Sequence, residues 1–102
     1  MKIVWRARAR DDLREAIQYL RQFTPEAALR TSATIRQKVT LLAEHPHLGR
    51  PGRVAGTREL VIAGTPYIVA YTVDSRLDSV VILSVLHGRR LWPEELAGGA
   101  DQ

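Results

Sequence analysis

The stretch TRELVIAGTPYIVAYTVDSRLDSVVILSVLHGRRLWP, from Thr57 to Pro93, decides the fold of this chain. It contains three apolar runs, at residues 58–62, 67–73 and 80–86, each of the length of a β-strand. Residues 63–66 and 74–78 separate the runs and carry the Gly, Pro, Asp and Ser residues typical of reversals between antiparallel strands. The stretch therefore predicts a three-stranded antiparallel meander.

The third run is the most apolar of the three, with six apolar side chains among its seven residues. A strand with apolar side chains on both faces is typical of the middle of a covered sheet, so we expect a central strand here. The middle run alternates instead, which places Tyr67 and Tyr71 on one face and Ile68 on the other. At this spacing, core packing of the two tyrosines is favoured over stacking on a nucleic-acid base.

The segment upstream of the meander predicts one short strand and a first helix. Residues 2–5 form an apolar run that we expect to join one side of the sheet. Leu13, Ile17 and Leu20 then recur at helical spacing, and the helix is expected to end near residues 21–23. Acidic residues at 11, 12 and 15 are expected in its early turns, where they complement the helix dipole.

A second helix is predicted to begin at Pro25, with Thr24 as its N-cap, and to end near Glu44. The five Pro and Gly residues between positions 46 and 56 predict a loop after it. The two helices form a hairpin that covers the meander. The sequence thus predicts an α+β fold: an N-terminal strand, a helical hairpin and a three-stranded antiparallel meander, in one sheet packed against both helices.

Length and composition restrict the possible functions. A chain of 102 residues predicts one domain, residues 1–96, and we expect a disordered tail at 97–102. Without cysteine there are no disulfides, thiolate zinc sites or cysteine nucleophiles, and we expect neither metal nor cofactor. No apolar run approaches the roughly 20 residues of a membrane span, so we expect a cytoplasmic protein without membrane contacts.

The net charge of +4 comes from 15 basic and 11 acidic residues, and nearly all of the basic residues are arginine. Arginine suits either a nucleic acid or an acidic protein partner. Five arginines flank the meander and are predicted to line a basic cleft: Arg50, Arg53, Arg58, Arg89 and Arg90. The arginines of the helices are interpreted as solvated surface residues.

Three further side chains are candidates for contact with a target. His87 ends the last strand and, beside arginines, has the chemistry of a general acid or base; hydrogen bonding to backbone is the alternative interpretation. Tyr67 is expected beside His87, because the end of the third strand lies next to the start of the second. Trp92 is expected to fold back onto the sheet edge.

Four segments together resemble the RelE/ParE superfamily of bacterial toxins. They follow the order strand, helical hairpin and meander, and they cover about residues 2–93: EHPHLGR at 44–50, GTRELV at 56–61, PYIVAY at 66–71, and ILSVL with HGRR at 82–90. The resemblance implies the toxin of a type II toxin–antitoxin pair. It further implies an antitoxin that wraps the sheet and the hairpin, and a complex that represses its own operon.

The superfamily contains two mechanisms, and position 68 bears on the choice between them. RelE-type toxins cleave mRNA in the ribosomal A site, and their hallmark is an arginine just before the Leu-Val-Tyr of the middle strand of the meander. Here that position is Ile68, which can neither donate to a phosphate nor move a proton. The pattern is similar instead to the ParE branch, which is associated with poisoning DNA gyrase.

Three hypotheses follow from this resemblance. The leading one is a non-enzymatic gyrase poison, whose target-binding residues are the five arginines with Tyr67, His87 and Trp92. The second is a ribosome-dependent mRNA endonuclease that uses Arg58, His87 and Arg89. The third is an antitoxin-binding module that has lost toxicity.

The antitoxin is expected to be disordered alone and to fold as a helix along the hairpin, forming a hetero-oligomer with the toxin. The apolar seams of the two helices supply the residues expected to contact it: Leu13, Ile17, Leu20, Ile35 and Val39.

Overall fold

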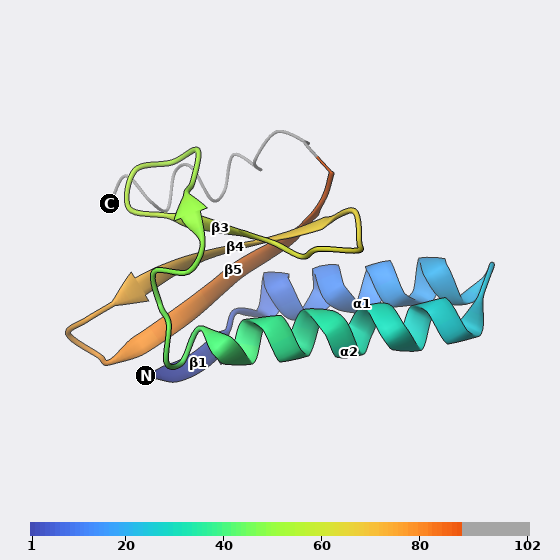
Figure 1. The fold of residues 1–102 in the computed structure, drawn as a ribbon, viewed down its shortest axis with the longest axis horizontal. Helices are drawn as coiled ribbons and strands as arrows, with labels where there is room; N and C mark the ends of the chain where they lie inside the picture. Colours follow the sequence, from blue (N-terminus) through green and yellow to red (C-terminus); the bar gives the residue numbers. More distant parts are fainter. Residues whose placement is uncertain (89–102) are drawn as a thin grey trace.

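The computed structural model describes residues 1–88 and consists of two helices on one face of a five-stranded sheet (Figure 1). The predicted tail at 97–102, together with Arg89, Arg90 and Trp92, lies outside the described residues. Along the chain the elements are β1 Lys2–Trp5, α1 Ala7–Arg21, α2 Pro25–Leu41, β2 Arg50–Pro51, β3 Arg58–Val61, β4 Tyr67–Asp74 and β5 Ser79–His87.

The strands are ordered β1-β5-β4-β3-β2. The antiparallel meander β3-β4-β5 is as predicted, and β5 is a central strand, because β1 pairs with it in parallel on the side away from β4. The short strand β2, which the sequence analysis missed, extends the sheet next to β3. The predicted α+β fold is confirmed.

One face of the sheet and the two helices enclose the main core. Tyr71, Val69 and Ile82 contribute from the strands, while Leu13 comes from α1 and Ile35 from α2. A smaller apolar cluster lies on the opposite, open face, where Ala70, Leu83 and Leu86 meet Val54. The two clusters explain why β5 is apolar in almost every position.

A β-bulge in β5 changes which of its side chains face each cluster. The register between β4 and β5 shifts by one residue between Ala70 and Tyr71, which leaves Leu83 as the extra residue of β5. Beyond this point β1 has ended, and the carboxylate of Asp12 takes over as the partner of β5. It accepts hydrogen bonds from the Ser84 hydroxyl and from the Val85 amide, the latter at 3.0 Å.

The helix ends differ from the sequence interpretation. α1 begins at Ala7 and has no acidic residue in its first turn, so Asp12 acts on β5 rather than on the helix dipole. Thr24 occupies the N-cap position of α2, but its side chain makes no capping hydrogen bond. α2 ends at Leu41, three residues before the expected end.

Tyr71 attaches the loop after α2 to the sheet. Its hydroxyl accepts a hydrogen bond from the Gly49 amide and donates one to the Pro46 carbonyl, both at 2.8 Å. Burial raises the pKa of Tyr71, so the hydroxyl stays protonated and able to donate at neutral pH. Gly49 has no room for a side chain, because a Cβ there would lie 2.7 Å from the Glu59 carbonyl oxygen.

We therefore predict that Tyr71→Phe destabilises the protein by about 1–3 kcal/mol, since it leaves two backbone groups of the loop without their partner. Urea denaturation measures the change. The matched control is Tyr19→Phe at a side chain that is 58% exposed, where a change within about 0.5 kcal/mol is expected. Equal losses in the two variants would contradict the role assigned to the Tyr71 hydroxyl.

Candidate functional site

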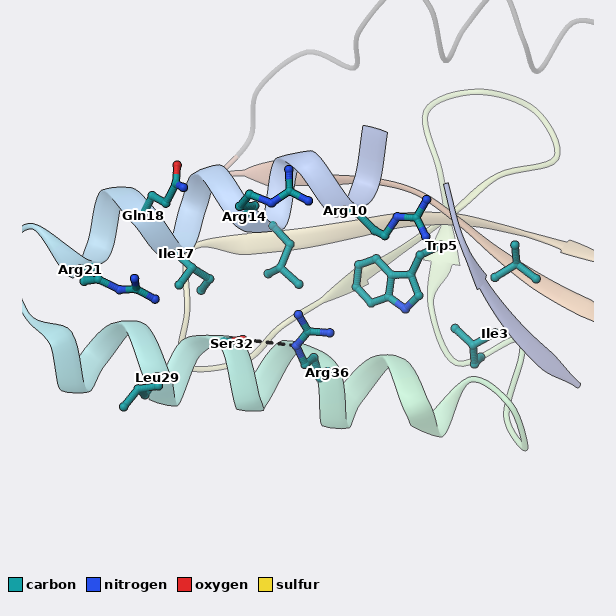
Figure 2. Close-up of a pocket in the computed structure, with 12 residues that line it drawn as sticks. Ile3, Trp5, Arg10, Arg14, Ile17, Gln18, Arg21, Leu29, Ser32 and Arg36 are labelled. Carbon is teal, nitrogen blue, oxygen red and sulfur yellow. Dashed lines mark hydrogen bonds between the residues drawn. The ribbon is translucent and has the colours of Figure 1, made fainter. Parts of the chain in front are cut away.

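A groove lies between α1 and α2 and is bounded at one end by β1 (Figure 2). It encloses about 890 Å³. Ile17 and Leu13 of α1 face it from one side and Leu29 of α2 from the other, while Trp5 and Ile3 come from β1. Leu29 is 69% exposed, so the groove presents apolar surface directly to solvent.

Four arginines surround this apolar floor: Arg10, Arg14 and Arg21 on α1, and Arg36 on α2. All four are exposed. Arg36 donates to the Ser32 hydroxyl at 3.4 Å, and Arg14 pairs with Asp11 at 3.2 Å in a solvent-exposed contact that holds it only weakly. We call this site the arginine groove. Its chemistry suits a segment that combines apolar and acidic side chains.

This site was not predicted from the sequence, because the helix arginines were interpreted as scattered and solvated. Arg10, Arg14 and Arg21 follow one stripe of α1 at spacings of four and seven residues, and that spacing was the available signal. The contribution of Arg36 depends on how α2 packs beside α1, which no spacing within one helix reveals.

The five residues expected on the hairpin seam lie at different depths. Leu13, Ile35 and Val39 are at most 3% exposed and pack in the main core, although Leu13 also lines the arginine groove. Their contact with an antitoxin stays a prediction. Ile17 and Leu20 are partly buried, and Ile17 lines the arginine groove.

The predicted basic cleft divides into separate contacts. Arg50 pairs with Glu59 at 3.0 Å, and Arg53 is exposed in the loop between β2 and β3. Arg58 donates to the Gly49 carbonyl at 2.7 Å, which ties β3 to the loop that Tyr71 also holds. The Arg58 guanidinium is therefore a structural support of this loop.

Arg58 lies beside the middle of β4 and His87 beside its start. Arg58 pairs with Tyr71, whereas His87 pairs with Tyr67 on the other neighbouring strand. At the usual rise and spacing of strands, four residues along β4 and one strand on each side place their Cα atoms about 16 Å apart. The combination of Arg58 and His87 with Arg89 stays a prediction, because Arg89 lies outside the described residues.

His87 itself lies where the sequence placed it, beside Tyr67. The two rings meet edge to face with centroids 5.3 Å apart, and Tyr67 is buried while His87 is exposed. Both lie on the helix side of the sheet. Within residues 1–88, no group of His, Asp and Glu side chains is arranged to hold a metal ion, and no helix is long and apolar enough to cross a membrane.

Ile68 occupies the open face of the sheet. Its cross-strand neighbours are Val61 on β3 and Leu86 on β5, and Ala70 follows it on the same face. The surroundings of this position are therefore apolar among the described residues. They provide no donor for a phosphate at the place where the RelE pattern has its arginine.

Comparison with known proteins agrees with this fold. The family described as "ParE toxin of type II toxin-antitoxin system, parDE" matches residues 3–92. The chain is 43% identical to the protein Y4kP of Sinorhizobium fredii, named as a toxin, over 93% of this chain and 96% of that one. It is 38% identical to toxin RelE2 of Caulobacter vibrioides over 88% and 98% of the two chains.

Solved structures show the same architecture. The chromosomal ParDE system from P. aeruginosa matches with a TM-score of 0.78 and 25% identity, over 87% of this chain and 97% of that chain. The toxin–antitoxin complex RelBE2 from Mycobacterium tuberculosis matches with a TM-score of 0.62 and 28% identity, over 84% of this chain and 95% of that chain. On the family match and the curated relatives, the chain belongs to the ParE toxin family of type II toxin–antitoxin systems.

Proposed function

We propose that this toxin acts by binding and inhibiting DNA gyrase, and that a cognate antitoxin neutralises it by occupying the arginine groove. A protein target is favoured over RNA cleavage because Ile68 lies in an apolar environment, between Val61 and Leu86. A phosphodiester in its transition state needs donors aimed at the developing charge, and removing one such donor commonly costs a hundredfold or more in rate. Gyrase inhibition requires the toxin to act in the cytoplasm.

The higher TM-score to the ParDE structure than to the RelBE2 structure also supports the ParE branch. A poison of this kind needs no catalytic group of its own, because the target enzyme makes the DNA break. The separation of Arg58 from His87 along β4 fits such a non-enzymatic role.

The antitoxin half of the proposal is supported by the chemistry of the groove and by the solved relatives. RelBE2 from Mycobacterium tuberculosis is a toxin–antitoxin complex. In this chain, an amphipathic helix fits a groove that has an apolar floor and a cationic rim. Its apolar side chains cover Ile17 and Leu29, and its carboxylates pair with Arg14, Arg21 and Arg36.

A second candidate function is ribosome-dependent mRNA cleavage, which the identity to toxin RelE2 of Caulobacter vibrioides favours. Arg58, His87 and Arg89 remain its candidate residues for phosphate binding, proton transfer and charge stabilisation. Because Arg58 is held by the Gly49 carbonyl, this mechanism requires the loop after α2 to release it.

For the target, we predict that purified toxin inhibits the supercoiling of relaxed plasmid by gyrase at micromolar concentration and that linear DNA accumulates. The linear product is expected because a poisoned enzyme retains cut DNA. Toxin mixed beforehand with its antitoxin is the control. Full gyrase activity together with new 5′ ends in translated messages, mapped by primer extension, would establish the endonuclease function instead.

For the antitoxin, we predict that Arg14→Glu combined with Arg21→Glu weakens its binding at least tenfold, a loss of about 1.4 kcal/mol or more. Isothermal titration calorimetry measures the affinity. Arg30→Glu combined with Arg76→Glu is the matched control, because it changes the net charge equally at exposed positions that do not line the groove.

Salt provides an independent check on the same groove. Because apolar side chains form its floor, the wild-type complex is expected to weaken only partly as salt rises to about 0.5 M. Complete dissociation there would mean that charge alone holds the antitoxin. An unchanged antitoxin affinity of the variant with Arg14→Glu and Arg21→Glu would show that the antitoxin binds another surface of the toxin.

A further inference from the structure

A second hollow lies on the other side of α1, between this helix and the ends of β4 and β5. It encloses about 390 Å³, and its lining includes Asp12, Glu15, Tyr19, Tyr67 and His87. We call it the acid–aromatic pocket. Among residues 1–88, its lining contains two carboxylates and no arginine or lysine, whereas the described lining of the arginine groove has four cations and no carboxylate.

The two carboxylates of the pocket have different roles. Asp12 is fixed by the Ser84 hydroxyl and the Val85 amide, and Arg8 approaches it at 3.9 Å. Glu15 is exposed one turn further along the helix and forms no ion pair with any residue of the described range 1–88. The pocket therefore combines one positioned carboxylate with one that has no ion-pair partner among the described residues.

Aromatic side chains extend the pocket along α1. Tyr19 lines it, and the ring of Phe23 meets that of Tyr19 edge to face at 5.1 Å. Tyr19 is 58% exposed and Phe23 is 69% exposed. An exposed aromatic pair suits contact with another protein, because aromatic side chains are enriched at binding hot spots.

The chemistry of this surface distinguishes protein from nucleic acid. Asp12 and Glu15 repel phosphate groups, so the pocket does not suit an RNA or DNA backbone. Carboxylates next to the exposed ring of Tyr19 suit a guanidinium or an ammonium group, which can form an ion pair and contact the aromatic ring. His87, considered above for work on a phosphodiester, thus lies in surroundings made for a cation.

We propose that the acid–aromatic pocket, together with Tyr19 and Phe23, is where the toxin engages its target protein, and that it takes an arginine or lysine side chain of that protein. The inference rests on the proposed function. Two of the residues expected to bind the target, Tyr67 and His87, line the pocket. The arginine groove has the opposite charge and lies across α1, so the antitoxin and the target recognise different faces of the same helix.

The first experiment separates the two faces with exposed substitutions. Tyr19→Ala, Phe23→Ala and Glu15→Gln are each expected to weaken gyrase inhibition about tenfold, whereas antitoxin affinity stays within about twofold of wild type. Leu77→Ala, at a leucine that is 68% exposed in the β4–β5 turn, and Glu26→Gln in α2 are the controls. Thermal melting of each variant reports on folding.

The outcomes distinguish this inference from the proposed function. Failure of the wild-type toxin to inhibit gyrase refutes the proposed function itself. If the Tyr19, Phe23 and Glu15 variants inhibit gyrase as strongly as the wild-type toxin, the acid–aromatic pocket is not the target-binding site, and only this inference is refuted. Loss of antitoxin affinity along with inhibition, in variants that melt like wild type, would mean that both partners share one surface, and it also overturns the inference.

A second experiment tests the ligand chemistry directly. The probes are the N-acetyl amides of arginine and lysine, with the N-acetyl amide of citrulline as the uncharged control. In ¹H–¹⁵N spectra of the toxin, the cationic probes are expected to shift the amides of Glu15, Tyr19 and His87 and to bind at least threefold more weakly to Glu15→Gln. Equal shifts with citrulline, or shifts confined to the arginine groove, overturn the proposal.

Discussion

The position of β5 in the middle of the sheet is the constraint on which the rest of the structure depends. It pairs with β4 along its whole length and with β1 over its first half. Its side chains alternate between the main core and the cluster on the open face, and after the bulge at Leu83 it is Val85 that packs in the core and Leu86 in the cluster. Beyond the end of β1, the carboxylate of Asp12 accepts hydrogen bonds from Ser84 and Val85 of β5. The sheet and α1 are therefore joined by a polar contact as well as by apolar packing.

That contact also determines how α1 is used. Because Asp12 faces β5, the adjoining surface of the helix carries the acidic and aromatic side chains, while Arg10, Arg14 and Arg21 turn toward α2. The described linings of the arginine groove and the acid–aromatic pocket thus differ in charge, although Asp11 pairs with Arg14 and Arg8 approaches Asp12.

The loop after α2 shows how polar groups that suggest chemistry can instead hold a fold together. Tyr71, Arg58 and the Gly49 backbone form a connected set of hydrogen bonds. Arg58 is therefore engaged at a distance from His87, and Ile68 lies among apolar neighbours on the opposite face. Among the described residues, these polar groups therefore hold the loop and the sheet together.

The sequence by itself determined the three strands of the meander, the strand at residues 2–5 and the two helices, because apolar periodicity and turn residues act between near neighbours along the chain. It also identified the toxin superfamily, and it located His87 beside Tyr67 from the antiparallel order alone. Only the tertiary structure decided that Ile35 and Val39 are core, that Arg58 and His87 lie apart, and that arginines of two helices meet in one groove. These features depend on the rotation of each helix about its axis and on the register between strands. Both are fixed by packing between segments that are distant in the sequence.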